Sequence, residues 1–293
     1  MKQPLISVIT ICYNSEACIE GTIQSVLAQD YPHIDYVIID GGSKDRTLDI
    51  VARYRDRLGY FVSEPDEGIS DAFNKGIAAA KGDLIVMINS DDILLPGALA
   101  SVAQAYDGCT DVYRGNVIVA NADTDYRGRE VPSMRFPLAP LTIRCAHQGT
   151  FITPEAYQRY GLYDKKFRYM MDYDLLTRFY QRGATFKYVD TDIAEFRLGG
   201  VSGAWSYRKR YDIMHVVTNN GGSQLRAIWY YIYMVSFDLT KRLVIALFGI
   251  NALKRLHYGR LKNRKTAEVT PPKRHSFAHW AGQRLLPAQR CID

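Results

Sequence analysis

Residues 81–92 read KGDLIVMINSDD, and this stretch decides the fold. Its centre, 84–88, consists of five uncharged apolar residues, which is typical of a short strand buried on both faces. The strand runs directly into Asn89 and, two residues later, into Asp91 and Asp92. A buried strand that ends in acidic side chains favours an α/β protein, because such folds bind ligands at the carboxyl ends of parallel strands.

The sequence before this stretch repeats the same arrangement. Apolar runs at 5–12, 36–39 and 59–62 alternate with segments of helical spacing, one of which covers about 45–57. Strands that alternate with helices predict a parallel sheet covered by helices. Each run is followed by polar residues, so four strand ends bring such side chains to one edge of the sheet: Tyr13 and Asn14, then Asp40, then Glu64 and Asp66, then Asp91 and Asp92.

The alternation loosens after residue 110. Strand-like pieces are expected at 111–120 and 186–189, and a helix is expected within 165–182. This helix carries Asp172, Asp174 and Arg178. Arg178 follows Asp174 by one helical turn, so it is as well placed to pair with that carboxylate as to hold a phosphate.

Composition limits the class of protein. Of the 293 residues, 47% are hydrophobic and 23% are charged, which predicts a globular chain with a full core. The five cysteines are scattered and have no CxxC spacing, which argues against a disulfide framework or a zinc site. Met1–Pro4 leads at once into the first strand without a signal-peptide pattern, so the catalytic part is expected to be cytoplasmic.

The charge of +6 belongs to the C-terminal end of the chain. From residue 241 onward there are 12 Lys and Arg against two acids, so the first 240 residues hold 25 basic and 29 acidic side chains. Uncharged runs at 227–237 and 243–253 fall short of the ~20 apolar residues that span a bilayer. An apolar helix followed by a basic tail favours an amphipathic anchor on an anionic membrane surface. The alternative is a helix packed on the protein's own core, with a solvated tail.

The aspartates at the strand ends suggest a nucleotide and metal site. Adjacent carboxylates repel unless a cation or hydrogen-bond donors offset them, and oxygen ligands suit Mg²⁺ or Mn²⁺. At the end of a buried strand Asp40 is suited to accept the imide N–H of a uracil ring, and Gly41 and Gly42 allow a ligand close to the backbone. The structural alternatives are helix capping by Asp91 and Asp92, and turn formation by Asp40.

Five stretches together resemble the family 2 glycosyltransferases. They are VITICYN (8–14), IIDGGSKDRT (38–47), SEPDEGISDAFNKGI (63–77), KGDLIVMINSDD (81–92) and MMDYDLLTRF (170–179). The resemblance covers residues 5 to about 200 and is closest to the branch that builds bacterial capsule, exopolysaccharide and O-antigen. It implies a GT-A fold, in which a Rossmann-like, mostly parallel sheet is flanked by helices. It also implies an inverting reaction on nucleotide-sugar donors.

The resemblance also implies roles for individual residues. Asp172 takes the place of the catalytic base, and Asp174 is the second candidate. Asp92 and Asp91 take the place of the ligands of a divalent metal, Mn²⁺ or Mg²⁺. His147 and Arg197 are expected on the acceptor or phosphate side. The expected donor-binding residues are Ile11, Tyr13, Asp40, Asp71, Lys75 and Asp91.

Three positions depart from the family's pattern. Asn89 replaces the first acid of the Asp-x-Asp-type motif, so metal binding depends more on Asp92. Phe73 stands where many members have Arg, and Lys75 or the helix N-terminus near Ser70 is expected to replace that contact with phosphate. Met171 replaces the Glu of the family's Glu-Asp pair.

The expected organisation is a catalytic domain over 1–215 and a C-terminal helical, basic extension over 216–293. Within the first, about 1–110 is the nucleotide-sugar half and about 111–215 the acceptor half. A Gly-rich loop after Arg197 is a candidate lid.

The expected function is transfer of a sugar, from a UDP-sugar or a related donor, to a lipid-linked or oligosaccharide acceptor. The expected place is the cytoplasmic face of the cell membrane, as a peripheral protein. A dinucleotide-dependent oxidoreductase is excluded because the turn after the first strand reads CYNSEA rather than GxGxxG. A nucleotidyltransferase lacks its Gly-rich basic loop there, and the Tyr-rich apolar run favours lipid over nucleic acid as partner of the tail. The remaining alternative is a non-catalytic scaffold in a membrane glycan-assembly complex.

Overall fold

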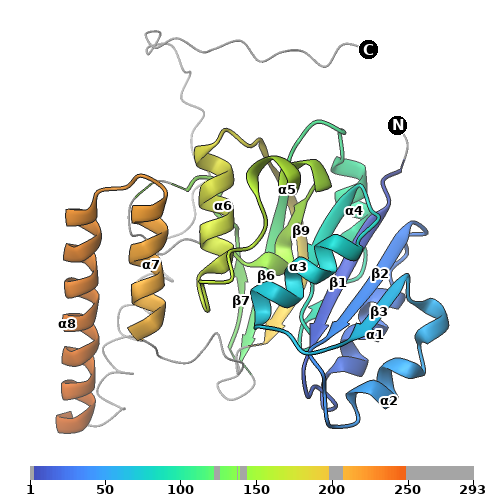
Figure 1. Cartoon of the computed structure of the whole chain (residues 1–293), viewed down its shortest axis with the longest axis horizontal. Coiled ribbons are helices and arrows are strands. Elements are labelled where there is room, and N and C mark those ends of the chain that lie inside the picture. Colours follow the sequence, from blue (N-terminus) through green and yellow to red (C-terminus); the bar gives the residue numbers. More distant parts are fainter. Residues whose placement is uncertain (1–2, 122–125, 137, 139–143, 198–206, 249–293) are drawn as a thin grey trace, which may run out of the picture. The chain divides into compact units, whose positions relative to one another are not determined.

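The computed structural model describes the chain except for residues 1–2, 122–125, 137, 139–143, 198–206 and 249–293. Its centre is a nine-stranded sheet with helices on both faces (Figure 1). The strands are β1 (Ile6–Cys12), β2 (Ile34–Asp40), β3 (Tyr60–Ser63), β4 (Leu84–Met87), β5 (Ile93–Leu94), β6 (Val112–Asn121), β7 (Tyr126–Glu130), β8 (Thr150–Ile152) and β9 (Phe186–Arg197). The α-helices are α1 (Ile19–Leu27), α2 (Thr47–Ala52), α3 (Ile69–Ala79), α4 (Ala98–Ala105), α5 (Pro154–Tyr160), α6 (Met171–Gln181), α7 (Tyr207–Asn219) and α8 (Gln224–Phe248). Two short 3₁₀ turns are η1 (Arg55–Arg57) and η2 (His147–Gly149).

The first half of the sheet is parallel, as the sequence predicts. Its strands lie in the order β3-β2-β1-β4, so the chain steps outward from β1 to β3 and then crosses back to the other side of β1. The carboxyl ends of β1 and β4 therefore lie at a topological switch point, where the connecting helices leave toward opposite faces. In open α/β sheets this is the place where ligands bind.

The second half of the sheet is mixed. β8 pairs antiparallel with β4 and with β6, while β6 and β9 run parallel to each other. β7 pairs with β6, and the short β5 pairs antiparallel with β9. This half brings the turn η2 and the start of α6 to the carboxyl ends of β1 and β4.

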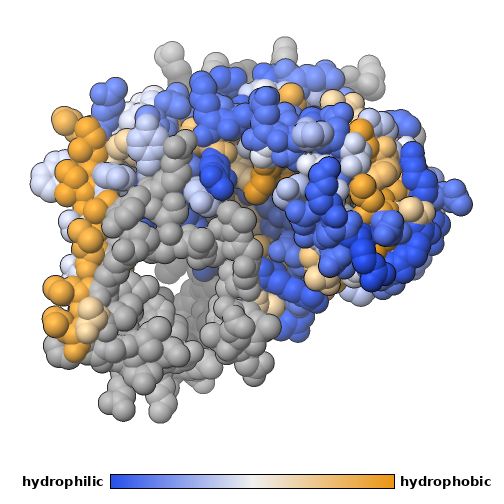
Figure 2. All heavy atoms as spheres, turned by 60° about the horizontal axis from the view of Figure 1, so that its bottom comes forward, coloured by the Kyte–Doolittle hydropathy of each residue, from blue (hydrophilic) through white to orange (hydrophobic). Residues whose placement is uncertain are grey.

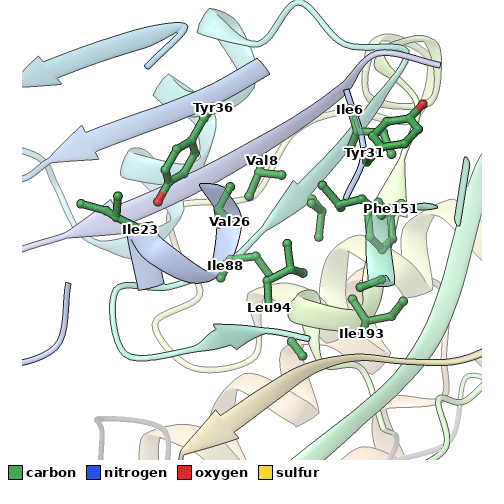
Figure 3. Packing of buried hydrophobic residues seen from close by; sticks show 14 of the residues in the cluster. Ile6, Val8, Ile23, Val26, Tyr31, Tyr36, Ile88, Leu94, Phe151 and Ile193 are labelled. Carbon is green, nitrogen blue, oxygen red and sulfur yellow. The ribbon is translucent and has the colours of Figure 1, made fainter. Parts of the chain in front are cut away.

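The sheet is held by an apolar core on each face. In β1 the side chains alternate, so Ile6 and Val8 pack in one cluster and Ile9 packs in the other. The first cluster includes Ile23 and Val26 of α1 and extends along the sheet to side chains of β8 and β9 (Figure 3). The second cluster includes side chains of α3, α5, α6 and α7. Burial of both faces explains why the strands are continuous apolar runs rather than alternating ones.

One predicted helix is shorter than expected. The segment expected at 45–57 forms α2 over Thr47–Ala52 and the separate turn η1. The helix expected within 165–182 is present as α6, which begins at Met171 and carries Asp172, Asp174 and Arg178. The preceding segment is held in another conformation by long-range bonds: the Asn74 amide donates to Tyr163 O at 2.9 Å, and Tyr163 N donates to Asn74 Oδ1 at 3.0 Å.

The expected C-terminal helical region is present as α7 and α8. The chain divides into compact units at Ile232/Tyr233, and α7 lies in the first unit. The buried carboxylate of Asp212 in α7 accepts from Tyr169 N at 3.1 Å, which ties α7 to the loop before α6. In the part of the chain that the structure describes, every helix is too short or too polar to cross a bilayer. The functional division into two domains stays a prediction.

Candidate active site

The loops after β1, β2 and β4 are fixed to one another. Asn14 has a φ of +48°, in the left-handed region. Its side-chain Oδ1 accepts a hydrogen bond from Lys44 N at 2.8 Å, and its backbone N–H donates to Ser43 Oγ at 2.8 Å. The hydroxyl of Thr22 in α1 lies 2.7 Å from both Ser90 O and Asp92 O, so it anchors the loop after β4. The carboxyl ends of these strands therefore form a preorganised edge.

Asp40 organises the loop after β2. Its fully buried carboxylate accepts from Gly42 N and Ser43 N at 3.0 and 2.9 Å, and from the hydroxyls of Ser43 and Ser63 at 2.5 and 2.6 Å. Burial raises the pKa of this carboxyl, but the hydrogen bonds outweigh burial and hold the pKa below its ordinary value. The thiol of Cys12 also lies near this carboxylate, with Sγ 3.5 Å from Asp40 Oδ1. The internal donors occupy most of the carboxylate's acceptor capacity, and contact with a nucleotide base stays a prediction.

Asp91 and Asp92 are adjacent but lie in different environments. Asp91 is partly exposed, whereas Asp92 is fully buried. Asp92 Oδ2 accepts from the Gln148 amide at 2.8 Å and from Asn89 N at 3.2 Å. Burial, together with the charge of Asp91, raises the pKa of Asp92 to about 7, although His147 and the hydrogen bonds from Gln148 and Asn89 oppose this rise. Asp91 is therefore the more accessible of the two carboxylates, and Asp92 is held in place by Gln148 and by the backbone of Asn89.

His147 and Asp172 form the second part of the site. His147 Nδ1 lies 2.8 Å from Asp172 Oδ2, and the two side chains are 12% and 18% exposed. The imidazole also packs edge-on against Phe73, with ring centroids 5.2 Å apart. Burial lowers the pKa of His147, but Asp172, Asp92 and Asp91 outweigh it and raise the pKa above its ordinary value. His147 thus couples the predicted base electrostatically to the two acids after β4.

Several buried polar atoms here are without a partner among the described residues. They are Asn89 Oδ1, Asp92 Oδ1, His147 Nε2 and Asp172 Oδ1. A buried polar atom that makes no hydrogen bond costs about 1–3 kcal/mol, so native structures retain such atoms where a ligand, ion or water satisfies them. The four atoms therefore delimit a candidate ligand site.

The oxygen atoms of this site are suitable ligands for a small hard cation. The orphaned atoms after β4 are oxygens, and Mg²⁺ typically binds one or two carboxylates and completes its shell with water and substrate phosphates. Within the described residues no group of three His, Cys, Asp or Glu side chains forms a closed metal cage. The residues therefore fit an ion that is shared with a phosphorylated substrate.

Asp174 has a structural partner. Its buried carboxylate accepts from Arg178 Nε at 2.8 Å, one helical turn away, which is one of the two roles considered for Arg178. Asn220, after α7, lies 3.5 Å from the other oxygen. Burial raises the pKa of Asp174, and the guanidinium partly offsets this rise. Asp172, which has a free oxygen, is the better placed of the two base candidates.

The remaining predicted residues lie in varied settings. Tyr13, directly after β1, is 61% exposed, while Ile11 is half-buried in β1. On α3, Lys75 Nζ is 2.8 Å from Glu64 and 3.6 Å from Asp71. Arg197 ends β9, with Nε 3.8 Å from a Glu195 oxygen. The candidate lid after Arg197 lies outside the described residues.

Comparison with known proteins decides the family. The sequence model of glycosyl transferase family 2 matches residues 7–169, more than half of the chain. This chain belongs to glycosyltransferase family 2. An uncharacterised glycosyltransferase of Rickettsia typhi is 29% identical over 197 residues. That match covers 61% of this chain and only 61% of the relative.

Solved structures of glycosyltransferases share the GT-A fold with this family 2 chain. S. aureus TarS (residues 1–349), in complex with UDP-GlcNAc, matches with a TM-score of 0.59 at 19% identity, over 83% of this chain and 75% of TarS. The mannosyltransferase PcManGT of Pyrobaculum calidifontis, in complex with GDP-Man and Mn²⁺, matches with a TM-score of 0.59 at 18% identity, over 90% and 81% of the two chains. The expected fold class is confirmed.

Gln148 is a further residue of this site in the family 2 chain, and it is not predicted from the sequence. It is buried and bonds to Asp92 across 56 positions of sequence. The available signal was its place beside His147, because a buried amide next to a site histidine needs partners for its donors.

Proposed function

We propose that this chain is an inverting glycosyltransferase that transfers a sugar from a nucleotide-sugar donor, with UDP as the expected nucleotide, to the hydroxyl group of a glycan or lipid-linked acceptor. The observation that carries the proposal is the grouping of Asp91, Asp92, His147 and Asp172 at the switch point of the sheet, with buried polar atoms that lack partners. The family and its UDP- and GDP-sugar-bound structural neighbours support this choice of substrate class.

The proposed reaction is a single displacement. The acceptor oxygen forms a bond to the anomeric carbon while the bond from that carbon to the diphosphate oxygen breaks, and the electron pair leaves with the nucleoside diphosphate. Asp172 Oδ1 takes the proton of the acceptor hydroxyl. Tyr13 stacks on the nucleotide base, and Asp40 fixes the loop beside it. Attack opposite to the leaving group inverts the anomeric configuration.

A divalent cation is part of the proposal. Asp91, supported by Asp92, would hold it. When bound, the cation neutralises charge that develops on the diphosphate leaving group.

The first test is nucleotide binding by the full chain. Calorimetry with UDP, GDP and TDP, with and without Mn²⁺, is expected to show one nucleotide that binds at least roughly tenfold more tightly with the metal, because the metal shares its ligands with the phosphates. Binding of none of the three under either condition would contradict the proposed function and favour the scaffold alternative.

We further propose that the protein docks on an anionic membrane surface through α8. The large apolar side chains of this helix are exposed: Leu225 (74%), Ile228, Trp229 (72%), Ile232, Tyr233, Phe237, Leu239, Leu243 and Leu247. Each of them has another member of the group three or four residues away, and Figure 2 shows an orange strip along α8. The sequence after α8 holds ten Lys and Arg against two acids, which suits an anionic leaflet. A surface-bound enzyme meets a lipid-linked acceptor at the interface.

Docking is tested by replacing both Leu225 and Trp229 with Glu. The double variant is expected to bind phosphatidylglycerol vesicles at least ~10-fold more weakly in a sedimentation assay, because two large apolar side chains no longer enter the bilayer. The matched control is Leu162→Glu, which changes another exposed leucine away from α8. Equal binding by the double variant and the wild type would contradict docking through this face.

A further inference from the structure

Three polar side chains of the site share one hydrogen-bonding arrangement. In three groups one polar atom is held by a hydrogen bond and the other is free: Asp92 by Oδ2, Asp172 by Oδ2 and His147 by Nδ1. The free atoms are Asp92 Oδ1, Asp172 Oδ1 and His147 Nε2. A carboxylate held by one oxygen cannot rotate freely, so its second oxygen keeps a fixed direction.

The hydrogen bonds that hold the two carboxylates come from two residues that are adjacent in sequence. His147 and Gln148 are the first two residues of η2, and each contacts one carboxylate at 2.8 Å. Gln148 donates from its amide N–H to Asp92, and His147 donates from Nδ1–H to an ionised Asp172, which only accepts hydrogen bonds. One short turn therefore connects the acid after β4 with the acid at the start of α6.

The turn itself is tightly fixed. A side chain at Gly149 would place its Cβ 2.7 Å from Gly115 O, so the backbone of β6 approaches too closely for any other residue. Thr150 Oγ1 donates a hydrogen bond to Ala146 O at 2.8 Å and accepts one from Nε of the buried Arg114 at 3.1 Å. Phe73 of α3 packs against the His147 ring. The turn is thus held from β6, β8 and α3.

We propose that His147 and Gln148 together form a positioning element that sets the spacing and orientation of the base Asp172 and the metal-side acid Asp92. The inference rests on the proposed function, because it assigns both residues to the same transfer reaction. Neither residue needs to touch the reacting atoms. Enzymes lose rate steeply when a catalytic group is misplaced by about 1 Å, and groups that orient a metal ligand typically affect metal affinity 10–100-fold.

The His147 half of the proposal is tested by three variants. The amide nitrogen of Asn occupies the place of Nδ1, whereas that of Gln occupies the place of Nε2. Turnover of the UDP-sugar by the full chain, with water as acceptor, is measured as kcat and KM. We expect His147→Asn to retain kcat within roughly fivefold, while His147→Gln and His147→Leu lose about 10²-fold with KM for the donor unchanged.

The opposite order would overturn the proposal, since activity in His147→Gln and loss in His147→Asn would show that Nε2 acts on the substrate directly. Wild-type turnover in all three variants would overturn it as well. Nucleotide affinity, measured by calorimetry, is expected to match the wild type in every His147 variant, which separates misplacement of the base from misfolding. The matched control is His33→Asn, an exposed histidine just before β2 at the opposite edge of the sheet.

The Gln148 half is read from metal-dependent binding rather than from turnover. Gln148→Leu removes the bond to Asp92 at similar volume, and the Kd for UDP in the presence of Mn²⁺ is expected to rise about tenfold while the Kd without metal stays unchanged. An unchanged Kd with Mn²⁺ would overturn this half. Gln158→Leu, at an exposed position of α5, is the control. Wild-type binding and turnover are established first, so a failure of the proposed function shows in the wild type and a failure of this inference shows only in the variants.

Discussion

Asp172→Asn is expected to lower the rate of sugar transfer roughly 10²–10⁴-fold while the Kd for the nucleotide stays within about twofold of the wild type. The amide has nearly the same size as the carboxylate, but it cannot take the proton of the acceptor hydroxyl. Asp172 is 18% exposed, has one oxygen without a partner among the described residues and is held by His147 through the other. The measurement is single-turnover transfer together with calorimetry of nucleotide binding.

The neighbouring Asp174 provides the contrast. Asp174→Asn breaks the buried pair with Arg178, which is expected to lower the free energy of unfolding by about 3 kcal/mol. Asp172→Asn should therefore lose transfer activity at constant stability, whereas Asp174→Asn should lose stability. A selective loss of transfer in Asp174→Asn, with normal transfer in Asp172→Asn, would reassign the base. Asp56→Asn changes an exposed aspartate of η1 and serves as the control.

Asp91→Asn is expected to abolish the effect of metal on nucleotide binding and to lower transfer about 10³-fold, since a bound cation supplies several kcal/mol of charge stabilisation in such reactions. Asp91 is the more accessible member of the acidic pair, so an ion shared with a diphosphate is expected to reach it first. The measurement is the ratio of the Kd for the nucleotide with and without Mn²⁺, which should approach one in the variant. Removal of metal from the wild type with a chelator should give the same Kd and the same residual rate.

Asp92→Asn separates the two acids. Its carboxylate is buried and bonded to Gln148 and Asn89, so the variant is expected to keep part of the metal effect and to be less stable. If Asp92→Asn lost the metal effect and Asp91→Asn retained it, the order of the two acids would be reversed. Asp30→Asn, an exposed position before β2 at the opposite edge of the sheet, is the control.

The parallel half of the fold was open to prediction because its signals are local. Each strand is a short apolar run followed at once by its polar residues, and β1 to β4 appear in the structure within two residues of the expected positions. Asp40, Asp91 and Asp92 could be assigned to one edge of the sheet because the carboxyl ends of parallel strands share that edge.

The second half was less predictable because its determinants are distant in sequence. The loop before α6 is tied to α3 by bonds between Asn74 and Tyr163, which lie 89 positions apart in sequence and which no helical periodicity reveals. Likewise, the contacts of His147 with Asp172 and of Gln148 with Asp92 arise only when η2 is placed by the antiparallel pairing of β8. The sequence indicated the residue types of the site, and the tertiary structure determined which of their atoms are held and which are free.

The position of β4 between the two halves has a consequence for synthesis of the chain. β4 pairs with β1 on one side and with β8 on the other, and β8 lies more than sixty residues later. As the nascent chain leaves the ribosome, β1 to β4 are complete while one edge of β4, with Ile85 and Val86, still lacks its neighbour. Uncovered apolar strand edges promote aggregation. The second half of the sheet therefore covers the strand edge that the first half leaves open, so a chain that stops before β8 is expected to self-associate.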